Sequence, residues 1–99
     1  MAYIAGQTVT LSSDLTSISP FDSVIFEIGQ YNNKKLQYKY PSTEGYKTIS
    51  KNGNIYSFVM TSEDTANFLG VYGVELTWVS SSIVNKAQCS GLEFISEIK

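Results

Sequence analysis

The feature that most constrains this chain is a period of two in its apolar residues, repeated in short segments that turn-forming residues separate. Every second residue is apolar across residues 24–28 and again across residues 72–78. Successive side chains of a β-strand point to opposite faces, so this pattern predicts strands with one buried face. Short strands with turn signals at hairpin-like spacing are typical of all-β domains built as a sandwich or a barrel.

The turn signals predict where the strands end. Asn52–Gly53 predicts a tight hairpin, because Gly takes the positive φ that a type I′ turn requires. The weaker run at residues 46–51 predicts one strand, and Gly91 separates a strand at residues 83–90 from a last one that begins at Leu92. The result is one domain over residues 1–99, an antiparallel β-sandwich of about seven to eight strands.

One short helical turn is expected between two of these strands. Ser62 is the predicted N-cap, and Glu63 and Asp64 complement the positive end of the helix. Gly70 is the predicted C-terminal stop.

The core is predicted from the positions that share the inward face of their strands. These positions are Val9, Leu11, Val24, Phe26, Ile28, Phe58, Tyr72, Val74, Leu76, Trp78 and Phe94.

Charge and composition exclude several classes of function. The chain has 99 residues, a net charge of −2, seven lysines as its basic residues and no histidine. Recognition of nucleic acid depends on arginine forks and clustered positive charge, so we expect no nucleic-acid partner. Without histidine there is no Ser–His or Cys–His nucleophile pair and no imidazole ligand for a metal, so we expect no enzyme, no cofactor and no metal site.

Two features of the sequence leave a chemical role to consider: the acidic residues of the loops and the single cysteine. A Ca²⁺ site formed by Asp14, Asp22 and loop carbonyls is an alternative, although no EF-hand spacing supports it. Cys89 is the single cysteine. Without a partner for a disulfide or a cation to lower its pKa, its thiol is expected to be structural and buried.

Membrane insertion and export are not expected. No apolar stretch approaches the roughly 20 residues of a transmembrane helix, and residues 1–4 do not resemble a signal peptide. We therefore expect a protein made in a cytoplasm.

Tyrosine is the one feature of the sequence that suggests binding. Tyr31, Tyr38, Tyr40 and Tyr46 lie within one stretch that has few charges. Tyrosine is enriched at protein interfaces, because it offers a large contact area at a low cost in entropy. The alternative is that Tyr38 and Tyr40 join Leu36 on the core face with their hydroxyls at its edge.

Two segments carry a family resemblance. Residues 61–66, Thr-Ser-Glu-Asp-Thr-Ala, followed by Gly70-Val71-Tyr72-Gly73-Val74, resemble the corner between strands E and F of immunoglobulin-like domains. This resemblance implies that Tyr72 is a corner tyrosine with its hydroxyl bonded to upstream main chain, near residues 63–68. Val74 takes the place of the second cysteine and Trp78 follows the tyrosine, so an antibody-type domain is excluded.

The order of motifs over most of the chain is similar to that of small immunoglobulin-like modules of bacteriophage virions, such as the N-terminal domains of baseplate upper proteins. The matching segments are Asn52–Gly53, Thr61–Thr65, Gly70–Tyr72 and Gly91–Phe94. The resemblance implies an immunoglobulin-like sandwich with Tyr72 and Trp78 as structural residues.

The functional expectation is a non-enzymatic structural protein of a virion, located in the capsid decoration, neck, tail or baseplate and assembled in the cytoplasm of a bacterial host. Its partners would be other virion proteins or copies of itself. The alternative is an adhesion module of a phage or bacterium that binds a carbohydrate or host receptor.

Overall fold

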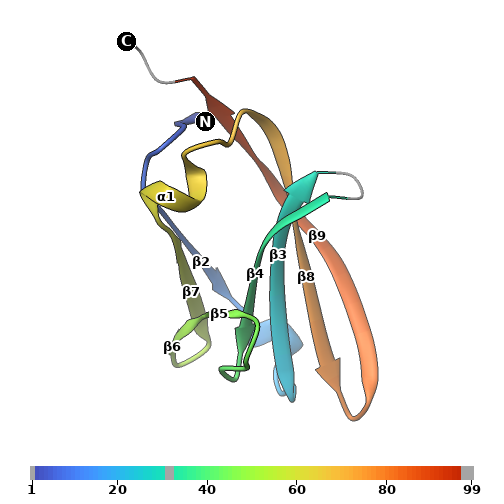
Figure 1. Cartoon of the computed structure of the whole chain (residues 1–99). Helices are drawn as coiled ribbons and strands as arrows, with labels where there is room; N and C mark the ends of the chain where they lie inside the picture. The colour runs from blue at the N-terminus through green and yellow to red at the C-terminus, as the bar shows by residue number, and fades with distance from the viewer. Residues whose placement is uncertain (1, 31–32, 97–99) are drawn as a thin grey trace.

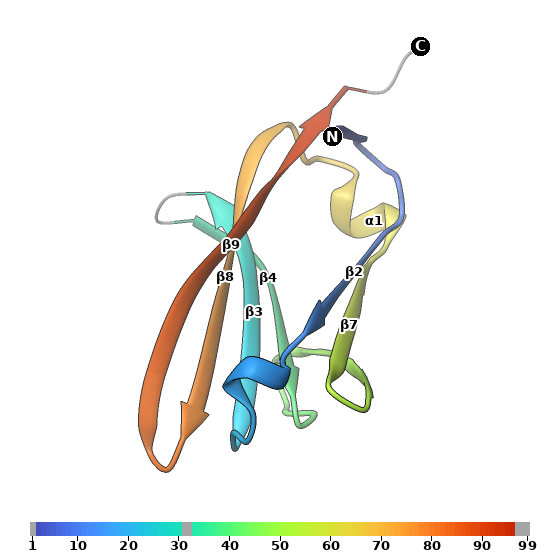
Figure 2. The ribbon, with the colours of Figure 1, turned by 180° about the vertical axis from the view of Figure 1, so that it is seen from behind.

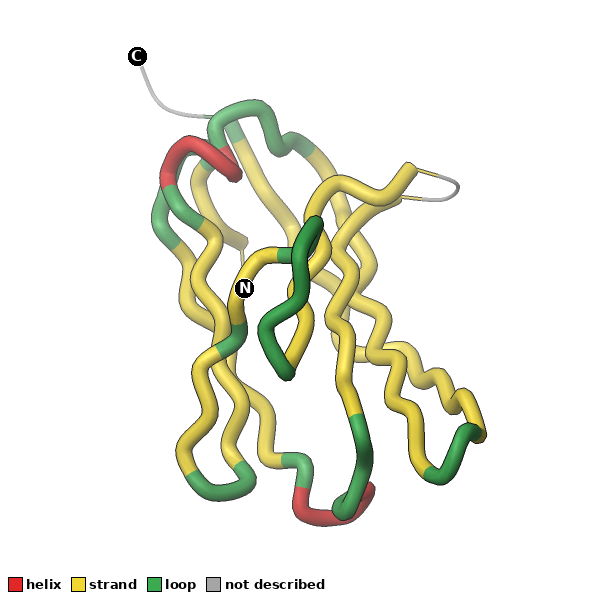
Figure 3. The backbone as a smooth tube through the Cα atoms, turned by 60° about the horizontal axis from the view of Figure 1, so that its bottom comes forward, coloured by secondary structure: helices red, strands yellow, loops and turns green. Residues whose placement is uncertain are grey.

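The computed structural model describes residues 2–30 and 33–96, and of residues 34, 35 and 90 it describes the backbone alone. Strands make up most of this part of the chain (Figure 3). The predicted all-β class is confirmed, and the strands form two sheets of unequal size.

The larger sheet has six strands in the order β1-β9-β8-β3-β4-β5. Their bounds are β1 Ala2–Ile4, β3 Ser23–Gln30, β4 Asn33–Tyr40, β5 Lys47–Thr48, β8 Gly70–Ser80 and β9 Ile83–Ile95. The sheet is mixed, since β1 is parallel to β9 and β5 is parallel to β4. The prediction of a purely antiparallel arrangement is therefore wrong at these two short strands, because alternation in the sequence does not encode the direction of a strand's neighbour.

The smaller sheet has the order β2-β7-β6 and is antiparallel throughout. Its strands are β2 Val9–Asp14, β6 Ser50–Asn52 and β7 Ile55–Met60. It lies across from β3 and β4 (Figure 1). Phe58 connects the two sheets, with its ring centroid 5.0 Å from that of Phe26 and 4.4 Å from that of Tyr38.

The described part of the chain contains nine strands where about seven to eight are expected. The run predicted as one strand at residues 46–51 is divided, because buried Ile49 lies between β5 in one sheet and β6 in the other. The two strands predicted on either side of Gly91 are a single strand, β9.

The core agrees closely with the inward positions that the sequence predicts. Nine of the eleven predicted residues are buried, and the other two, Leu11 and Trp78, are half-buried and pack against the cluster. The aromatic rings of Tyr72, Phe68 and Phe94 form one end of this core, with Tyr72 stacked on Phe68 at 4.5 Å.

A β-bulge explains how β9 continues through Gly91. Val74 on β8 faces Cys89, but Tyr72 faces Leu92, so Ser90 and Gly91 together lie opposite a single residue of β8. The extra residue shifts the side-chain alternation by one. Cys89 and Leu92 consequently both face the core although three positions separate them. A Cβ atom at position 91 would lie 3.3 Å from a carbonyl oxygen of β8, which favours Gly there.

Two tight hairpin turns hold adjacent strands together. Between β6 and β7 the central residues are Gly53 and Asn54, one position later than predicted, and Gly53 has the expected positive φ of 62°. The turn between β8 and β9 contains Ser81 and Ser82 at φ 52° and 68°. Positive φ at both central positions is the type I′ geometry.

The predicted helical turn is present but is short. Helix α1 covers Ser62–Thr65, with a capping box formed by Thr61 and Asp64, so the N-cap is Thr61 and the predicted Ser62 is the first helical residue. Gly70 has a φ of 97° and begins β8, and four residues separate it from the end of the helix. A 3-10 turn, η1, covers Thr16–Ile18.

Candidate functional site

The predicted tyrosine surface is divided by the structure. Tyr31 lies outside the described residues. Tyr38 is 1% exposed and belongs to the core, whereas Tyr40 and Tyr46 are half-buried. The stretch therefore does not present a continuous row of exposed rings within the described residues.

Tyr38 is a core residue, which corrects its assignment to an interface. Its hydroxyl donates to the Val59 carbonyl of β7 at 3.0 Å, and its ring lies against Phe58. Burial raises the pKa of Tyr38 well above its usual range, and the negative charge of Asp64 raises it further. The phenol is thus held neutral and joins the two sheets, because its partner strand belongs to the smaller sheet.

Tyr40 and Tyr46 keep part of their rings accessible. Tyr40 meets Tyr56 edge-on, with 5.4 Å between ring centroids. Tyr46 precedes β5, and the Lys39 ammonium lies 5.4 Å from its ring centroid. The cation lies over one face of the Tyr46 ring, at a distance typical of a cation–π interaction.

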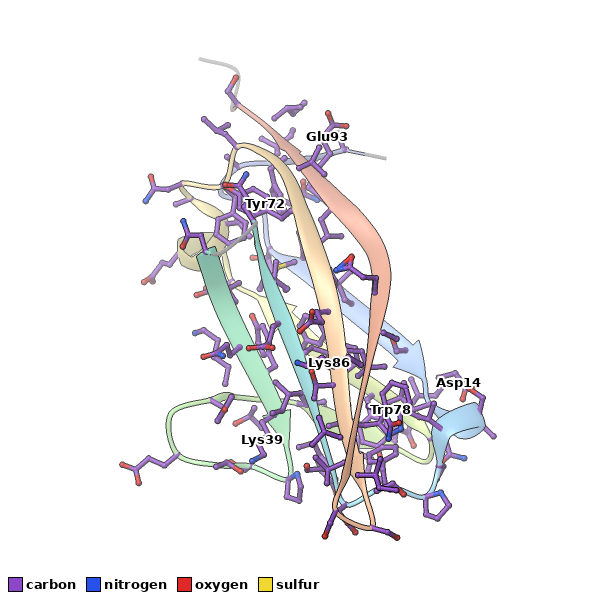
Figure 4. The ribbon with its side chains drawn as sticks, turned by 90° about the vertical axis from the view of Figure 1, so that its right-hand side faces the viewer. Asp14, Lys39, Tyr72, Trp78, Lys86 and Glu93 are labelled. Atoms are coloured by element: carbon purple, nitrogen blue, oxygen red, sulfur yellow. The ribbon has the colours of Figure 1, made fainter. Side chains whose placement is uncertain are left out.

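The two residues predicted to be structural lie at opposite ends of β8, as Figure 4 shows. Tyr72 is 4% exposed, and its hydroxyl accepts a hydrogen bond from the Leu69 N–H at 3.1 Å. The expected bond to upstream main chain is therefore present, one residue beyond the predicted segment. Trp78 is half-buried and packs against the core from the hairpin end of the strand.

The loop carboxylates bind nearby backbone. Asp14 accepts hydrogen bonds from the hydroxyl and N–H of Thr16, and these bonds lower its pKa. Asp22 accepts from the Ser81 N–H at 3.2 Å. Across residues 2–30 and 33–96, no three His, Cys, Asp or Glu side chains gather in a way that could hold a metal.

Asp64 stabilises the start of α1. Its carboxylate accepts from the Thr61 N–H at 3.0 Å, and Lys47 lies 3.4 Å away on the β5 side. Burial acts to raise the pKa of Asp64, but the hydrogen bonds from Thr61 and the charge of Lys47 outweigh it, so the pKa is lowered. This carboxylate is explained by capping, as its position next to Glu63 predicts.

The sequence did not predict a set of exposed apolar side chains at the end of the larger sheet where β1 pairs with the last part of β9. Ile4 and Ile95 are cross-strand partners on β1 and β9, and Val71 lies on the same face of β8. With Leu69 they form what we call the terminal patch, and their exposed fractions run from 42% at Ile4 to 65% at Val71. Glu93 lies among them and supplies a charge.

A second exposed apolar region lies at the opposite end of β9. Ile83 and Val84 follow the Ser81–Ser82 turn and are 63% and 61% exposed. They point to opposite faces of the strand, so both faces are apolar at this position. The signal in the sequence is the adjacent pair of β-branched apolar residues, which breaks the alternation that elsewhere separates core from surface.

Among residues 2–30 and 33–96, no strand pairs with the outer edge of β9 along its first part. β8 pairs with one edge of β9, and β1 occupies the other edge only at Glu93–Ile95. We call residues 83–89, which precede the bulge, the open edge. Figure 2 shows β9 running as a long strand past the end of β1.

The remaining chemistry of this region is limited. Cys89 is half-buried, and burial raises the pKa of its thiol, which favours the unreactive protonated form.

Neither helix in the described part of the chain is long and apolar enough to cross a membrane. Comparison of the chain with protein-family models, with curated proteins and with solved structures finds no match.

Proposed function

We propose that this chain is a non-enzymatic structural protein that acts by packing against other protein chains, as a component of a bacteriophage virion. The observation that carries the proposal is the exposed apolar surface at both ends of β9, the terminal patch and the Ile83–Val84 pair. Contiguous exposed apolar side chains are typical of surfaces that another protein covers.

The terminal patch is suited to packing because strands hold it rigidly. Ile4, Val71 and Ile95 project from three neighbouring strands. Tyr72 and Phe94, the chain neighbours of Val71 and Ile95, are buried in the core. Covering Ile4, Val71 and Ile95 costs little side-chain entropy, because these three residues are β-branched. Burial of each side chain contributes on the order of 1 kcal/mol or more to association.

An immunoglobulin-like sandwich is part of the proposal, and the strand order supports it. In such domains strands B, E and D form one sheet, and strands G, F and C form the other. In the order of strands within each sheet, β2, β7 and β6 take the first set of places, and β9, β8 and β3 take the second. Tyr72 on β8 then stands where a corner tyrosine of strand F stands, and its bond to Leu69 agrees with that role. The parallel strands β1 and β5 differ from that scheme.

The phage assignment rests on the resemblance of the motif order to virion modules, and its test is particle composition. Sequencing the genes on either side should find capsid or tail genes, and mass spectrometry of purified particles should detect this chain. Flanking metabolic genes and particles without the chain would refute the assignment.

The packing surface has its own test. We expect Val71→Ser to reduce incorporation into particles while leaving the melting temperature of the free protein nearly unchanged, because Val71 is 65% exposed. Val59→Ser is the matched control, since Val59 is an exposed valine, at 46%, on the smaller sheet. Normal incorporation of the Val71 variant would remove the terminal patch from the proposal.

Carbohydrate binding is the second candidate, and the partly exposed rings of Tyr40 and Tyr46 favour it. Partly exposed aromatic rings provide stacking surfaces for sugars, and Tyr40 and Tyr46 are both half-buried. A glycan array with the free protein tests this role. Binding that Tyr46→Ala abolishes and Val71→Ser leaves intact would favour adhesion over packing.

A further inference from the structure

We propose that the open edge of β9 pairs with the open edge of a second copy of this chain, as an antiparallel, two-fold symmetric extension of the larger sheet centred on Asn85. The proposal rests on the proposed packing function and names one partner for it. It concerns residues 83–89, at the opposite end of β9 from the terminal patch.

The hairpin turn determines which backbone groups are free at this edge. Ser80 and Ile83 flank the type I′ turn and form the first pair of the β8–β9 ladder. Along an antiparallel ladder, residues alternate between those that hydrogen-bond across it and those that do not. Counting from Ile83, the N–H and C=O groups of Val84, Lys86 and Gln88 therefore point away from β8 to the unpaired side.

The open edge lacks the usual protection of an edge strand. Soluble proteins guard such edges with proline, with charges or with a bulge. Residues 83–89 contain no proline, and their one charged residue is Lys86. The ammonium of Lys86 binds Glu75 and Thr77 at 3.2 Å each, over the face of β8, so this charge is directed away from the edge (Figure 4).

The edge of the smaller sheet provides a contrast. β2 is also unpaired on its outer side, but its exposed residues are polar, including Thr10, Ser12 and Asp14. A strand that adds to β2 would bury little apolar area, whereas one that adds to β9 covers Ile83 and Val84.

The sequence of the open edge complements itself in one register. With Asn85 opposite Asn85 of the second copy, Ile83 faces Ala87 of that copy, and both are exposed and apolar. Val84 faces the aliphatic stem of Lys86, and the two amides can each donate and accept a hydrogen bond. A register centred on Lys86 would instead place Val84 opposite the polar side chain of Gln88, which loses the apolar contact. A closed two-fold contact of this kind joins two copies and no more.

The association itself is tested by sedimentation equilibrium of the full chain over a wide range of concentrations. We expect a monomer–dimer equilibrium that Val84→Lys weakens at least tenfold, because the variant places a second lysine beside Lys86 of the partner. Val59→Lys is the matched control, since Val59 is an exposed valine, at 46%, on the smaller sheet and lies outside both the open edge and the terminal patch. A wild-type chain that stays monomeric, or equal weakening by both variants, would overturn the proposal.

The register is tested by disulfide trapping in a Cys89→Ser background. Asn85 would face its own copy as a non-hydrogen-bonded pair, whose Cα atoms lie about 4.5 Å apart, within the range of a disulfide. Asn85→Cys should therefore form a covalent dimer under mild oxidation, and Ala87→Cys should not. Dimers from Ala87→Cys alone would refute this register, and circular dichroism confirms that each variant folds.

The two proposals fail separately. A chain that is monomeric and uncrosslinked but still enters particles removes the second copy and leaves the packing function. A chain that dimerises through Asn85 but is absent from particles leaves the dimer and removes the virion role.

Discussion

Removal of the Tyr72 hydroxyl tests whether the hydrogen bond at the α1–β8 connection stabilises the fold. Tyr72→Phe deletes the acceptor of the Leu69 N–H but keeps the ring, which stacks on Phe68 at 4.5 Å and meets Phe94 edge-on at 5.9 Å. The substitution therefore isolates one hydrogen bond from the packing around it.

The magnitude depends on how well water can replace the hydroxyl. A buried donor left without a partner costs about 1–3 kcal/mol. The bond from the Leu69 N–H to the Tyr72 hydroxyl is only partly buried, so water can replace part of what it supplies. We expect a loss of about 1 kcal/mol in the free energy of unfolding, at the low end of this range. For a domain of this size that loss lowers the melting temperature by about 4–8 °C.

The assay is urea unfolding followed by fluorescence, for which the chain's single tryptophan, half-buried Trp78, is the probe. Tyr3→Phe is the matched control. Its ring also contacts Phe94, at 5.6 Å, and its hydroxyl makes no hydrogen bond within the described part of the chain. A loss of under about 0.3 kcal/mol at Tyr72, or equal losses in the two variants, would show that the bond contributes nothing beyond what water supplies.

Two further predictions concern a charge and a turn. The pKa of Asp64 is lowered from 3.8, so its contribution is present above about pH 4 and is lost as pH falls through the lowered pKa. Asp64→Asn should cost about 0.5–1 kcal/mol at pH 7 and less at pH 2, measured by urea unfolding at both. Glu63→Gln is its control, and an equal cost of Asp64→Asn at the two pH values would contradict the reasoning. At the β8–β9 turn, replacing Ser81 by Asn and Ser82 by Gly should stabilise the fold by about 1 kcal/mol, because both residues have positive φ. An unchanged melting temperature would show that neither serine is strained.

The sequence predicted most of the core because burial within a strand depends on parity, which is local. Val24, Phe26 and Ile28 share a face whichever strands lie beside them, and all three are buried. The same reasoning could not decide Tyr38, because its parity is equally consistent with a core position and with an exposed face. Its burial depends on Phe58 and Val59, which belong to the other sheet.

The neighbours of each strand were not predictable in the same way. The pairing of β1 with β9 joins residues that are about ninety positions apart, as Tyr3 with Phe94 shows. No local pattern encodes which strand remains at an edge. An exposed edge covered by another chain is expected from the few charges of the sequence, but its place on β9 and the terminal patch were missed for this reason, since both depend on where β1 stops along β9.

The bulge at Ser90–Gly91 has a consequence for how the chain tolerates change in length. Before it, Cys89 faces inward, and after it Leu92 and Phe94 do so while Glu93 and Ile95 face outward. Deleting one residue here would exchange these roles, exposing Phe94 and burying the Glu93 carboxylate. The two halves of β9 are thus set in phase by one residue. Substitutions in the open edge leave that alternation intact. A single insertion or deletion at the bulge would move each side chain in the last part of the strand to the opposite face.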